Sequence, residues 1–448
     1  ITIGDWSSDV CSSDLDIAIN SMEDTHLDSS MEANQGIPNT SELSPQKQNH
    51  VEWLKNSPLL YDFLMLHWLE YPSTIVEWIR GVESGKQHKY SLQKLYIATV
   101  APEGDQNYVS QLAFQIPNPE TEVDLVSFSE SGNLNAKPGH MSGQITSCHR
   151  INHDGPVAAI CHCPASPDIV FTSGPRCGLN VFDLRTQPAS PVDTFMHPLA
   201  SFQDCGATSS ALDWSIINEG YVASGSDNGK VCVWDALNQY KSPVVEFPPP
   251  QEMIVRCVCW HPSDSSLIFS SDMSGNVHQC DLRQKAQTCI LKRDEACLCV
   301  SVNPVERFLL ATAGGSGSVC LWDNRNLSHP LHTMIGHAKA VNQLRWNPFN
   351  CSSLASCGMD GRVCLWDLGR IGSAITPEQE REGPPELVFV HGGHTDSVID
   401  VSWNPNTPWI VASVGMDSML ELWQPVEPVY INSSQQRIGE GIAEIGRA

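Results

Sequence analysis

From Gly336 to Asp367 the chain reads GHAKAVNQLRWNPFNCSSLASCGMDGRVCLWD, and this stretch decides the fold. It contains three short apolar segments, Gln343–Trp346, Leu354–Cys357 and Val363–Trp366. An Asn-Pro turn separates the first two segments, and a Met-Asp-Gly turn precedes the third. Short strands with turn signals between them predict an antiparallel sheet.

The Trp-Asp pair that closes this stretch recurs along the chain. Copies, some of them degenerate, end at Asp183, Asp235, Asp281, Asp323, Asp367 and Gln424, at intervals of 42 to 57 residues. A four-stranded WD40 blade needs about 40–45 residues. The segments Lys94–Ala98 and Val109–Phe114 supply a weaker seventh copy. We therefore predict an all-β, seven-bladed WD40 β-propeller, in which a closed ring leaves only short sheet edges.

Four polar or aromatic residues of the quoted stretch are expected to bond to one another inside their blade. They are His337, Ser356, Asp360 and Trp366, and buried polar groups need such partners. Because Ser, His and Asp recur at blade positions, a hydrolytic triad chosen from them would be an accident of the repeat. No glycine loop opens a helix as nucleotide binding demands. We expect no catalytic residue and no enzymatic activity.

The composition favours a basic protein partner. The formal net charge is −25 and the pI about 4.9, so the chain should repel nucleic acid phosphates and attract basic proteins such as histones, ribosomal proteins or basic tails. No apolar run approaches the 18 or more residues of a membrane span. We expect no direct contact with nucleic acid or membrane.

The 17 cysteines predict core packing rather than a metal or disulfide framework. Several form Cys-x-Cys pairs, which in a strand place both sulfurs on one face as small buried apolar groups. Cys161, His162 and Cys163 lack a credible fourth metal ligand. The dispersed, odd number of cysteines favours a reducing compartment. We expect no metal and no cofactor.

The ends of the chain are expected to stay outside the fold. Asp5–Leu15 back-translates into a common sequencing adapter, and Glu444–Ala448 resembles the read-through of its complement. We predict that residues 1–15 and 444–448 are artefacts that contribute nothing to folding or binding. The predicted organisation is a disordered arm at 1–48, an N-terminal helix and lead-in at 49–80, the propeller at 81–432 and a disordered tail at 433–448.

The lead-in is predicted to be a helix over Val51–Ser73, with Pro58 near a start or kink. Leu60, Phe63, Leu64 and Trp68 form a stripe at helical spacing. One face would dock on the propeller, while the other is either covered by the ring and its loops or shared with a partner.

A long insertion, residues 371–390, accounts for the interval of 57 residues and is interpreted as the connection between the last two blades. Four glutamates lie before or around Gly383-Pro384-Pro385, and Leu387, Val388 and Phe389 follow. A basic amphipathic helix could use both the negative charge and the apolar ledge.

Two sets of motifs carry a resemblance to a known family. The stretches Asn56–Asp62 with Leu69–Ser73, and Gly383–Leu387 through His391–His394 and Ser402–Trp409, resemble the histone-binding WD40 chaperones of the retinoblastoma-binding and chromatin-assembly-factor type. The likeness covers roughly residues 49–432. It implies a non-enzymatic, mainly nuclear scaffold of chromatin assembly, Polycomb repressive or deacetylase complexes.

The resemblance also implies a site, a groove between the N-terminal helix and the proline-proline loop that holds a helix of histone H4 from the H3–H4 dimer. Glu382 would meet histone arginines, whereas Gln379 departs from the acid of the family. The implied apolar walls are Leu59, Leu60 and Leu64 on one side and Leu387, Val388, Phe389 and Val429 on the other.

A second family site, the central face that holds an H3 tail, is expected to be lost. Arg256 would repel a basic peptide, and only Glu70 remains of the acidic and amide set. The other matching positions are Pro156, Ala158, Thr208, Ser210, Ala340, Asn342 and Met416.

Two alternative functions remain open from the sequence. Asp183-Leu184-Arg185, Asp281-Leu282-Arg283 and Asp323-Asn324-Arg325 resemble the Asp-x-Arg motif with which receptors of cullin-RING ubiquitin ligases contact their adaptor, so Arg185, Arg283 and Arg325 are candidate contacts. An ordinary charge pair at each strand end is the simpler interpretation. The second alternative is a WD40 chaperone of ribosomal proteins.

Overall fold

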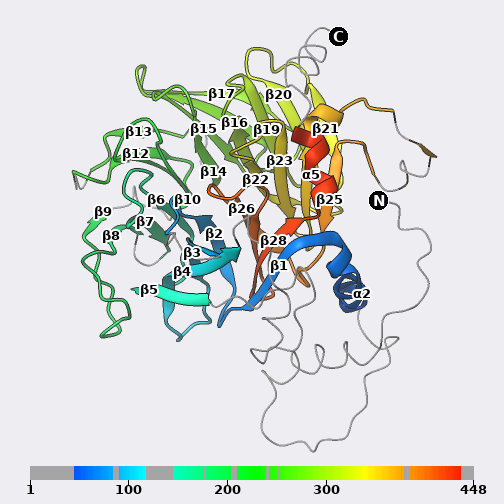
Figure 1. Ribbon diagram of the computed structural model, residues 1–448. Helices are drawn as coiled ribbons and strands as arrows, with labels where there is room; N and C mark the ends of the chain where they lie inside the picture. The colour runs from blue at the N-terminus through cyan, green and yellow to red at the C-terminus, as the bar shows by residue number, and fades with distance from the viewer. Residues whose placement is uncertain are drawn as a thin grey trace, which may run out of the picture.

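The computed structural model shows a ring of antiparallel sheets with a helix before and after it (Figure 1). The structure describes residues 45–83, 90–117, 145–175, 178–202, 209–238, 242–249, 253–374, 376–377, 381 and 383–434. Most of the predicted arm and tail, including both adapter-like segments, lies outside these residues.

Seven four-stranded sheets make up the ring, so the predicted seven-bladed propeller is confirmed, including its weak copy between residues 90 and 117. In ring order the sheets contain β2 (Ser73–Trp78), β3 (Tyr90–Thr99), β4 (Asn107–Pro117) and β5 (Ile145–His153); β6 (Ala159–His162), β7 (Ile169–Gly174), β8 (Gly178–Asp183) and β9 (Ala200–Phe202); β10 (Ser209–Trp214), β11 (Tyr221–Ser226), β12 (Val231–Asp235) and β13 (Val245–Phe247); β14 (Val255–Trp260), β15 (Leu267–Asp272), β16 (Asn276–Asp281) and β17 (Ala286–Lys292); β18 (Cys297–Val302), β19 (Leu309–Gly314), β20 (Ser318–Asp323) and β21 (His332–Ile335); β22 (Val341–Trp346), β23 (Ser353–Gly358), β24 (Val363–Asp367) and β25 (Leu387–His391); and β26 (Val398–Trp403), β27 (Val411–Gly415), β28 (Met419–Pro425) and β1 (Tyr61–Trp68).

The ring is closed by its first strand. β1 lies antiparallel to β28, with Leu64 opposite Trp423 and Leu66 opposite Glu421. The last blade therefore takes three strands from the C-terminal part of the chain and its outer strand from the N-terminal part. This pairing removes an open sheet edge, which would otherwise be a site for aggregation.

The predicted helix over Val51–Ser73 is wrong beyond its first part. Helix α2 spans Pro45–Leu60, and the chain then becomes β1 and β2, which belong to the ring, so the propeller begins at Tyr61 and not at residue 81. Both faces of β1 are buried: Phe63 and Met65 pack into one cluster and Leu64 into another. Consecutive apolar residues in such a strand cannot be told from a helical stripe by periodicity.

The long insertion also lies elsewhere in the fold than predicted. It joins β24 to β25 within one blade rather than joining the last two blades, and a short 3-10 helix, η2 (Leu368–Arg370), follows β24. Leu387–His391 is the outer strand β25 and not part of a loop. Each WD repeat ends on the third strand of a blade, so its outer strand comes from the following repeat.

The expected hydrogen-bonded set is present in the blade of β22–β25. His337 Nδ1 lies 3.0 Å from Asp360 Oδ1, and His337 Nε2 lies 2.7 Å from Ser356 Oγ. Trp366 Nε1 donates to the same Ser356 Oγ at 2.8 Å. These side chains satisfy one another, so the prediction that they are structural is confirmed.

The described cysteines are unpaired thiols that mostly fill the core, as in the cluster that contains Cys299 and Cys364. His162 lies 2.8 Å from Glu77 in an ion pair, away from any metal-like grouping with its neighbouring cysteines among the described residues. Within those residues, no helix is long and apolar enough to cross a membrane.

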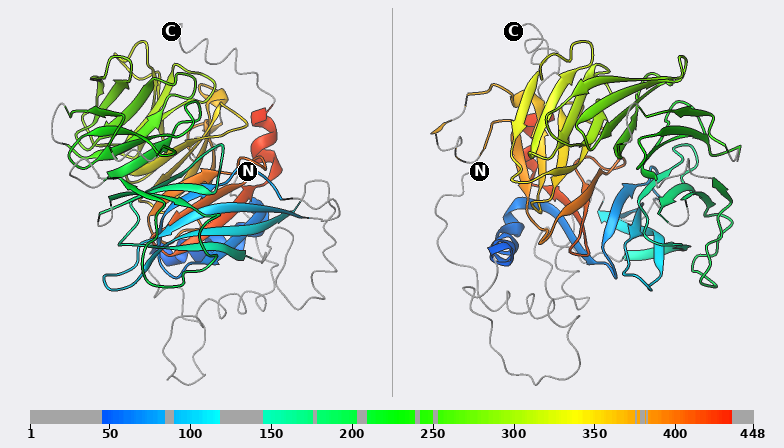
Figure 2. Two further views of the ribbon diagram at one scale, coloured as in Figure 1. Left: turned by 90° about the vertical axis from the view of Figure 1, so that its left-hand side faces the viewer. Right: turned by 180° about the vertical axis from the view of Figure 1, so that it is seen from behind.

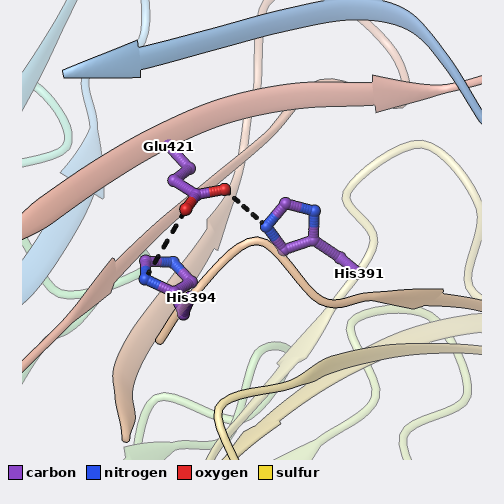
Figure 3. A group of neighbouring side chains, drawn as sticks. All are labelled: His391, His394 and Glu421. Atoms are coloured by element: carbon purple, nitrogen blue, oxygen red, sulfur yellow. Dashed lines mark ion pairs between the residues drawn. The ribbon is translucent and has the colours of Figure 1, made fainter. Parts of the chain in front are cut away.

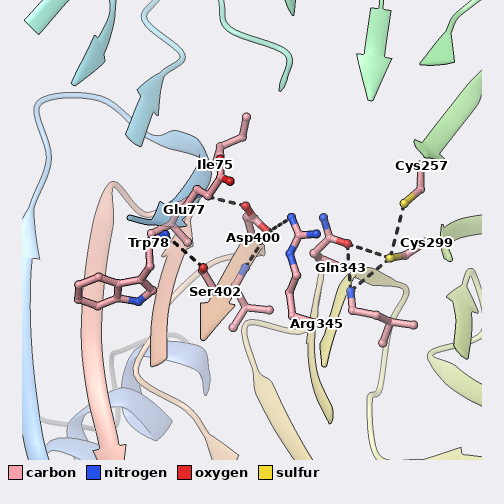
Figure 4. Close-up of polar contacts among 12 residues, drawn as sticks. Ile75, Glu77, Trp78, Cys257, Cys299, Gln343, Arg345, Asp400 and Ser402 are labelled. Carbon is pink, nitrogen blue, oxygen red and sulfur yellow. Dashed lines mark hydrogen bonds and ion pairs between the residues drawn. The ribbon is translucent and has the colours of Figure 1, made fainter. Parts of the chain in front are cut away.

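Polar contacts join the inner strands of neighbouring blades (Figure 4). Arg345 Nη2 lies 3.7 Å from Asp400 Oδ1, and Asp400 Oδ2 accepts a hydrogen bond from the Val76 backbone N–H at 3.1 Å. Cys299 Sγ donates to Gln343 Oε1 at 2.8 Å. A cavity of about 280 Å³ next to this network is lined in part by Asp213.

The Asp213 carboxyl should make stability depend on pH. Burial raises the pKa of Asp213 to about 7, although the Trp260 N–H, 2.6 Å from its Oδ2, opposes the shift. A raised carboxyl pKa favours the fold fully below the unfolded pKa of about 4, and this contribution is lost as the pH rises through about 7. Asp213→Asn should retain about 1–3 kcal/mol more unfolding free energy than the wild type between pH 5 and pH 8, measured by urea denaturation. Parallel pH profiles of the two proteins would contradict this assignment.

Candidate functional site

Helix α2 docks on the ring through Trp53, which is 8% exposed. Its Nε1 donates a hydrogen bond to Tyr61 Oη at 2.9 Å, and its ring packs edge-on against His391 at a centroid distance of 5.6 Å. The helix thus rests on the first residue of β1 and the last residue of β25. Figure 1 shows α2 at the edge of the ring beside β1 and β28, and Figure 2 shows it from two further sides.

The end of α2 follows from Pro58. Proline has no N–H, so the carbonyl four residues earlier loses its helical partner. The Ser57 hydroxyl donates to that Leu54 carbonyl at 3.0 Å instead. The helix ends at Leu60, whose carbonyl accepts from the Val426 N–H at 3.0 Å. This bond ties the end of α2 to the start of α5 (Glu427–Ser434).

An aromatic cluster lies under this junction. Tyr61 and Phe389 pack edge-on at 5.4 Å between ring centroids, and Phe389 lies 5.8 Å from Trp423. Tyr430 on α5 stacks on Trp409 at 5.3 Å and belongs to the same hydrophobic cluster. Parts of the chain that are far apart in the sequence, Tyr61 and Tyr430, thus share one packed unit.

The structure brings most of the predicted groove residues together. Leu60, Val388 and Phe389 are partly buried and pack on one cluster around Trp53 and Tyr61. Leu59 is 73% exposed at the end of α2. Val429 is half-buried on α5, next to the junction with Leu60.

Two predicted groove residues lie elsewhere. Leu64 is 2% exposed and is a core residue of β1, because it faces inward between β28 and the neighbouring blade, so its assignment to the groove wall is wrong. Leu387 packs on the adjacent cluster with Trp366 and Leu368. Glu382 and Gln379 lie outside the described residues.

Two exposed acids that the sequence analysis did not single out lie at the same junction. Asp62 accepts a hydrogen bond from the Glu427 backbone N–H at the start of α5, where a carboxylate also complements the helix dipole. Partial burial raises the pKa of Asp62, while this bond opposes the shift. Their signal in the sequence was weak, since neither acid belongs to a motif. They give the apolar surface a negative edge.

Glu386 of the proline-proline loop has an internal role instead. It is 3% exposed, and its Oε1 lies 2.7 Å from His332 Nε2. The pKa of Glu386 is lowered overall: burial acts to raise it, but the His332 hydrogen bond prevails. Glu386 therefore anchors the loop to β21.

The three Asp-x-Arg motifs form local pairs within their turns. Arg185, Arg283 and Arg325 each donate to the aspartate two residues earlier, with Nη2 to carboxylate distances of 2.7, 2.9 and 2.6 Å. The arginine side chains are 57%, 63% and 63% exposed. This is the geometry of the strand-end charge pair, and contact with a ligase adaptor remains untested.

The central-face residues offer little to a basic tail. Glu70, the one acid retained there, pairs with Arg150 at 2.6 Å. The Asn342 amide nitrogen donates to the Val398 carbonyl at 2.7 Å, and Met416 is 43% exposed. Thr208 lies outside the described residues. The expected loss of H3-tail binding stays a prediction.

Comparison with known families gives two matches. Residues 48–118 match a family model that describes histone-binding protein RBBP4 or the equivalent component of the CAF1 complex. Residues 202–235, 287–323, 328–367 and 385–424 match the WD domain, G-beta repeat. The first match covers most of α2 and all of β1, and the last WD repeat includes β25 and nearly all of β28.

Proposed function

This chain belongs to the histone-binding WD40 chaperone family, and on that premise we propose that it holds a helix of histone H4 between α2, the Gly383–His391 segment and α5. The observation that carries the proposal is the exposed Leu59 beside the half-buried Leu60, Val388 and Phe389. An amphipathic helix binds such a surface through residues spaced three and four apart.

The charge around this surface suits a basic ligand. Asp62 and Glu427 are exposed at the junction of α2 and α5, and the whole chain carries −25. Carboxylates at the rim of an interface attract arginine and lysine and discriminate against acidic partners. A histone helix supplies both an apolar face and cations.

The proposed role is that of a carrier and scaffold, without catalysis of its own. Binding H4 or the H3–H4 dimer would allow the propeller to deliver histones to chromatin assembly, Polycomb repressive or deacetylase complexes in the nucleus. The other faces of the ring would remain available for further components of those complexes.

Leu59→Asp tests the groove. Leu59 makes little contact within the protein, so the substitution should leave the fold intact but place a charge where an apolar histone residue docks. We expect the affinity for an H4 helix peptide to fall about 10- to 100-fold, the equivalent of one buried leucine. Isothermal titration calorimetry of the purified chain measures this change.

Val305→Asp is the matched control, because Val305 is 66% exposed on a turn of another blade. It should bind H4 as the wild type does. Equal H4 affinity of the Leu59→Asp variant and the control would exclude this surface. Stronger capture of ribosomal proteins than of histones by the wild type would favour the alternative chaperone function.

A further inference from the structure

His391, His394 and Glu421 form a buried group at the base of α2 (Figure 3). One ligand atom from each lies within 4.8 Å of the others, and all three residues are buried. His391 Nε2 is 2.8 Å from Glu421 Oε2, and His394 Nδ1 is 3.9 Å from Glu421 Oε1. Asp417 lies on the same histidine, 3.1 Å from His394 Nδ1.

The carboxylate of Glu421 is poorly satisfied by the protein. Its side chain is fully buried, and neither oxygen has a partner in hydrogen-bond geometry among the described residues; the 2.8 Å contact with His391 is a close charge pair at an unsuitable angle. With Asp417 nearby, two carboxylates share this interior. A buried charge needs strong compensation, and a divalent cation supplies it.

The neighbouring blade shows that the propeller does not require these groups. It has the same hydrogen-bonded set around His337, but Met334 and Cys364 occupy the positions that correspond to His391 and Glu421. Both of those side chains are buried. An apolar pair therefore satisfies the blade architecture, and the histidine and glutamate of the last blade invite a separate explanation.

We propose that His391, His394 and Glu421, with Asp417 as fourth ligand, bind one Zn²⁺ ion. Nitrogen and carboxylate ligands at about 2.0–2.2 Å in a tetrahedron are about 3.3 Å apart. The observed spacings of 2.8, 3.1 and 3.9 Å lie on both sides of this value, so small side-chain shifts suffice. The ion would replace the contact between His394 and Asp417 with two metal bonds.

The surroundings fit a structural zinc site. The other nitrogen of His391 lies 2.7 Å from Tyr61 Oη, the kind of outer partner that orients a metal-bound histidine. Gly393 leaves room for Glu421, since a Cβ there would lie 2.1 Å from Glu421 Oε2. A cavity of about 420 Å³, lined in part by His50, Trp53 and His394, gives access from the surface. Zinc would fasten β25 and β28 beneath Trp53 and so hold α2 in place.

The sequence predicts no metal here, because His394 is explained by the WD repeat and the three ligands are separated along the chain. Only the pairing of β28 with β1 and the docking of α2 enclose them. The inference is independent of the proposed H4 groove, because it concerns the metal content of the protein alone.

Metal titration of the full chain tests the proposal. After treatment with a chelator, the wild type should bind one equivalent of Zn²⁺ in calorimetry, and Co²⁺ should give the intense visible absorption of a tetrahedral site. Glu421→Gln should lower Zn²⁺ affinity about 100-fold or more, beyond the effect of losing an outer partner. Glu386→Gln is the matched control, because it alters another buried His–Glu pair and should leave Zn²⁺ binding unchanged.

Zn²⁺ binding that is absent in the wild type, or equally tight in Glu421→Gln, would overturn the site. His391→Met provides a second variant should Glu421→Gln fail to fold, since it installs the residue found at Met334. The Co²⁺ spectrum of the wild type requires no variant, and a weak octahedral spectrum would also rule out the proposed ligand set.

Discussion

Leu64→Ala is expected to destabilise the propeller by about 2–5 kcal/mol, the range for leucines truncated in a packed core. Leu64 is 2% exposed and lies opposite Trp423 on the strand that closes the ring. The cavity left there would weaken the contact between β1 and β28. Because β1 joins the first part of the chain to the last blade, loss of this contact should open the whole ring.

Leu59→Ala separates this effect from binding. Leu59 lies only five residues earlier but is 73% exposed, so its truncation should change the unfolding free energy by no more than about 0.5 kcal/mol. Urea denaturation of both variants, followed by tryptophan fluorescence, gives the comparison. Equal destabilisation by the two substitutions would show that β1 does not carry the closure.

Gly314→Ala should also destabilise the fold strongly, by about 1–3 kcal/mol or more, as overpacking does. A Cβ at Gly314 would lie 1.8 Å from the Ala296 carbonyl oxygen. That oxygen belongs to the backbone just before β18, so it cannot swing aside as a side chain would. Relief requires β18 and β19 to move apart.

The adjacent Gly315 is the internal control. A Cβ at Gly315 would meet only Glu295 Oε2, at 3.8 Å, which is ordinary contact. Gly315→Ala should therefore have a thermal unfolding midpoint close to that of the wild type, with Gly314→Ala clearly lower. Closely similar midpoints for the two alanine variants would contradict the assigned packing.

The repeat pattern was sufficient for the architecture. Trp-Asp endings, Asn-Pro turns and Gly-His pairs act locally, and each blade uses its own His, Ser, Asp and Trp, as His337 and Trp366 do. Such short-range rules are legible in a single sequence. The ring of seven sheets and the structural role of these residues could be predicted for that reason.

The groove was predicted only in part. Leu60, Val388 and Phe389 do meet on one cluster, but the sequence pattern could not separate Leu64 from them. A strand buried on both faces has apolar residues at every position, so its side chains carry no periodic sign of where they face. The acids Asp62 and Glu427 were overlooked because nothing local distinguishes them from other surface carboxylates.

By itself the sequence determined the blade repeat, the apolar strands and the acidic character of this protein, because each depends on residues close together in the chain. Only the tertiary structure decided that Tyr61–Trp68 closes the ring, which of two adjacent glycines is indispensable, and that His391, His394 and Glu421 meet under α2. These outcomes depend on contacts between segments tens to hundreds of residues apart. Burial and pairing partners at such distances are set by how the whole ring packs, and a local pattern contains no record of them.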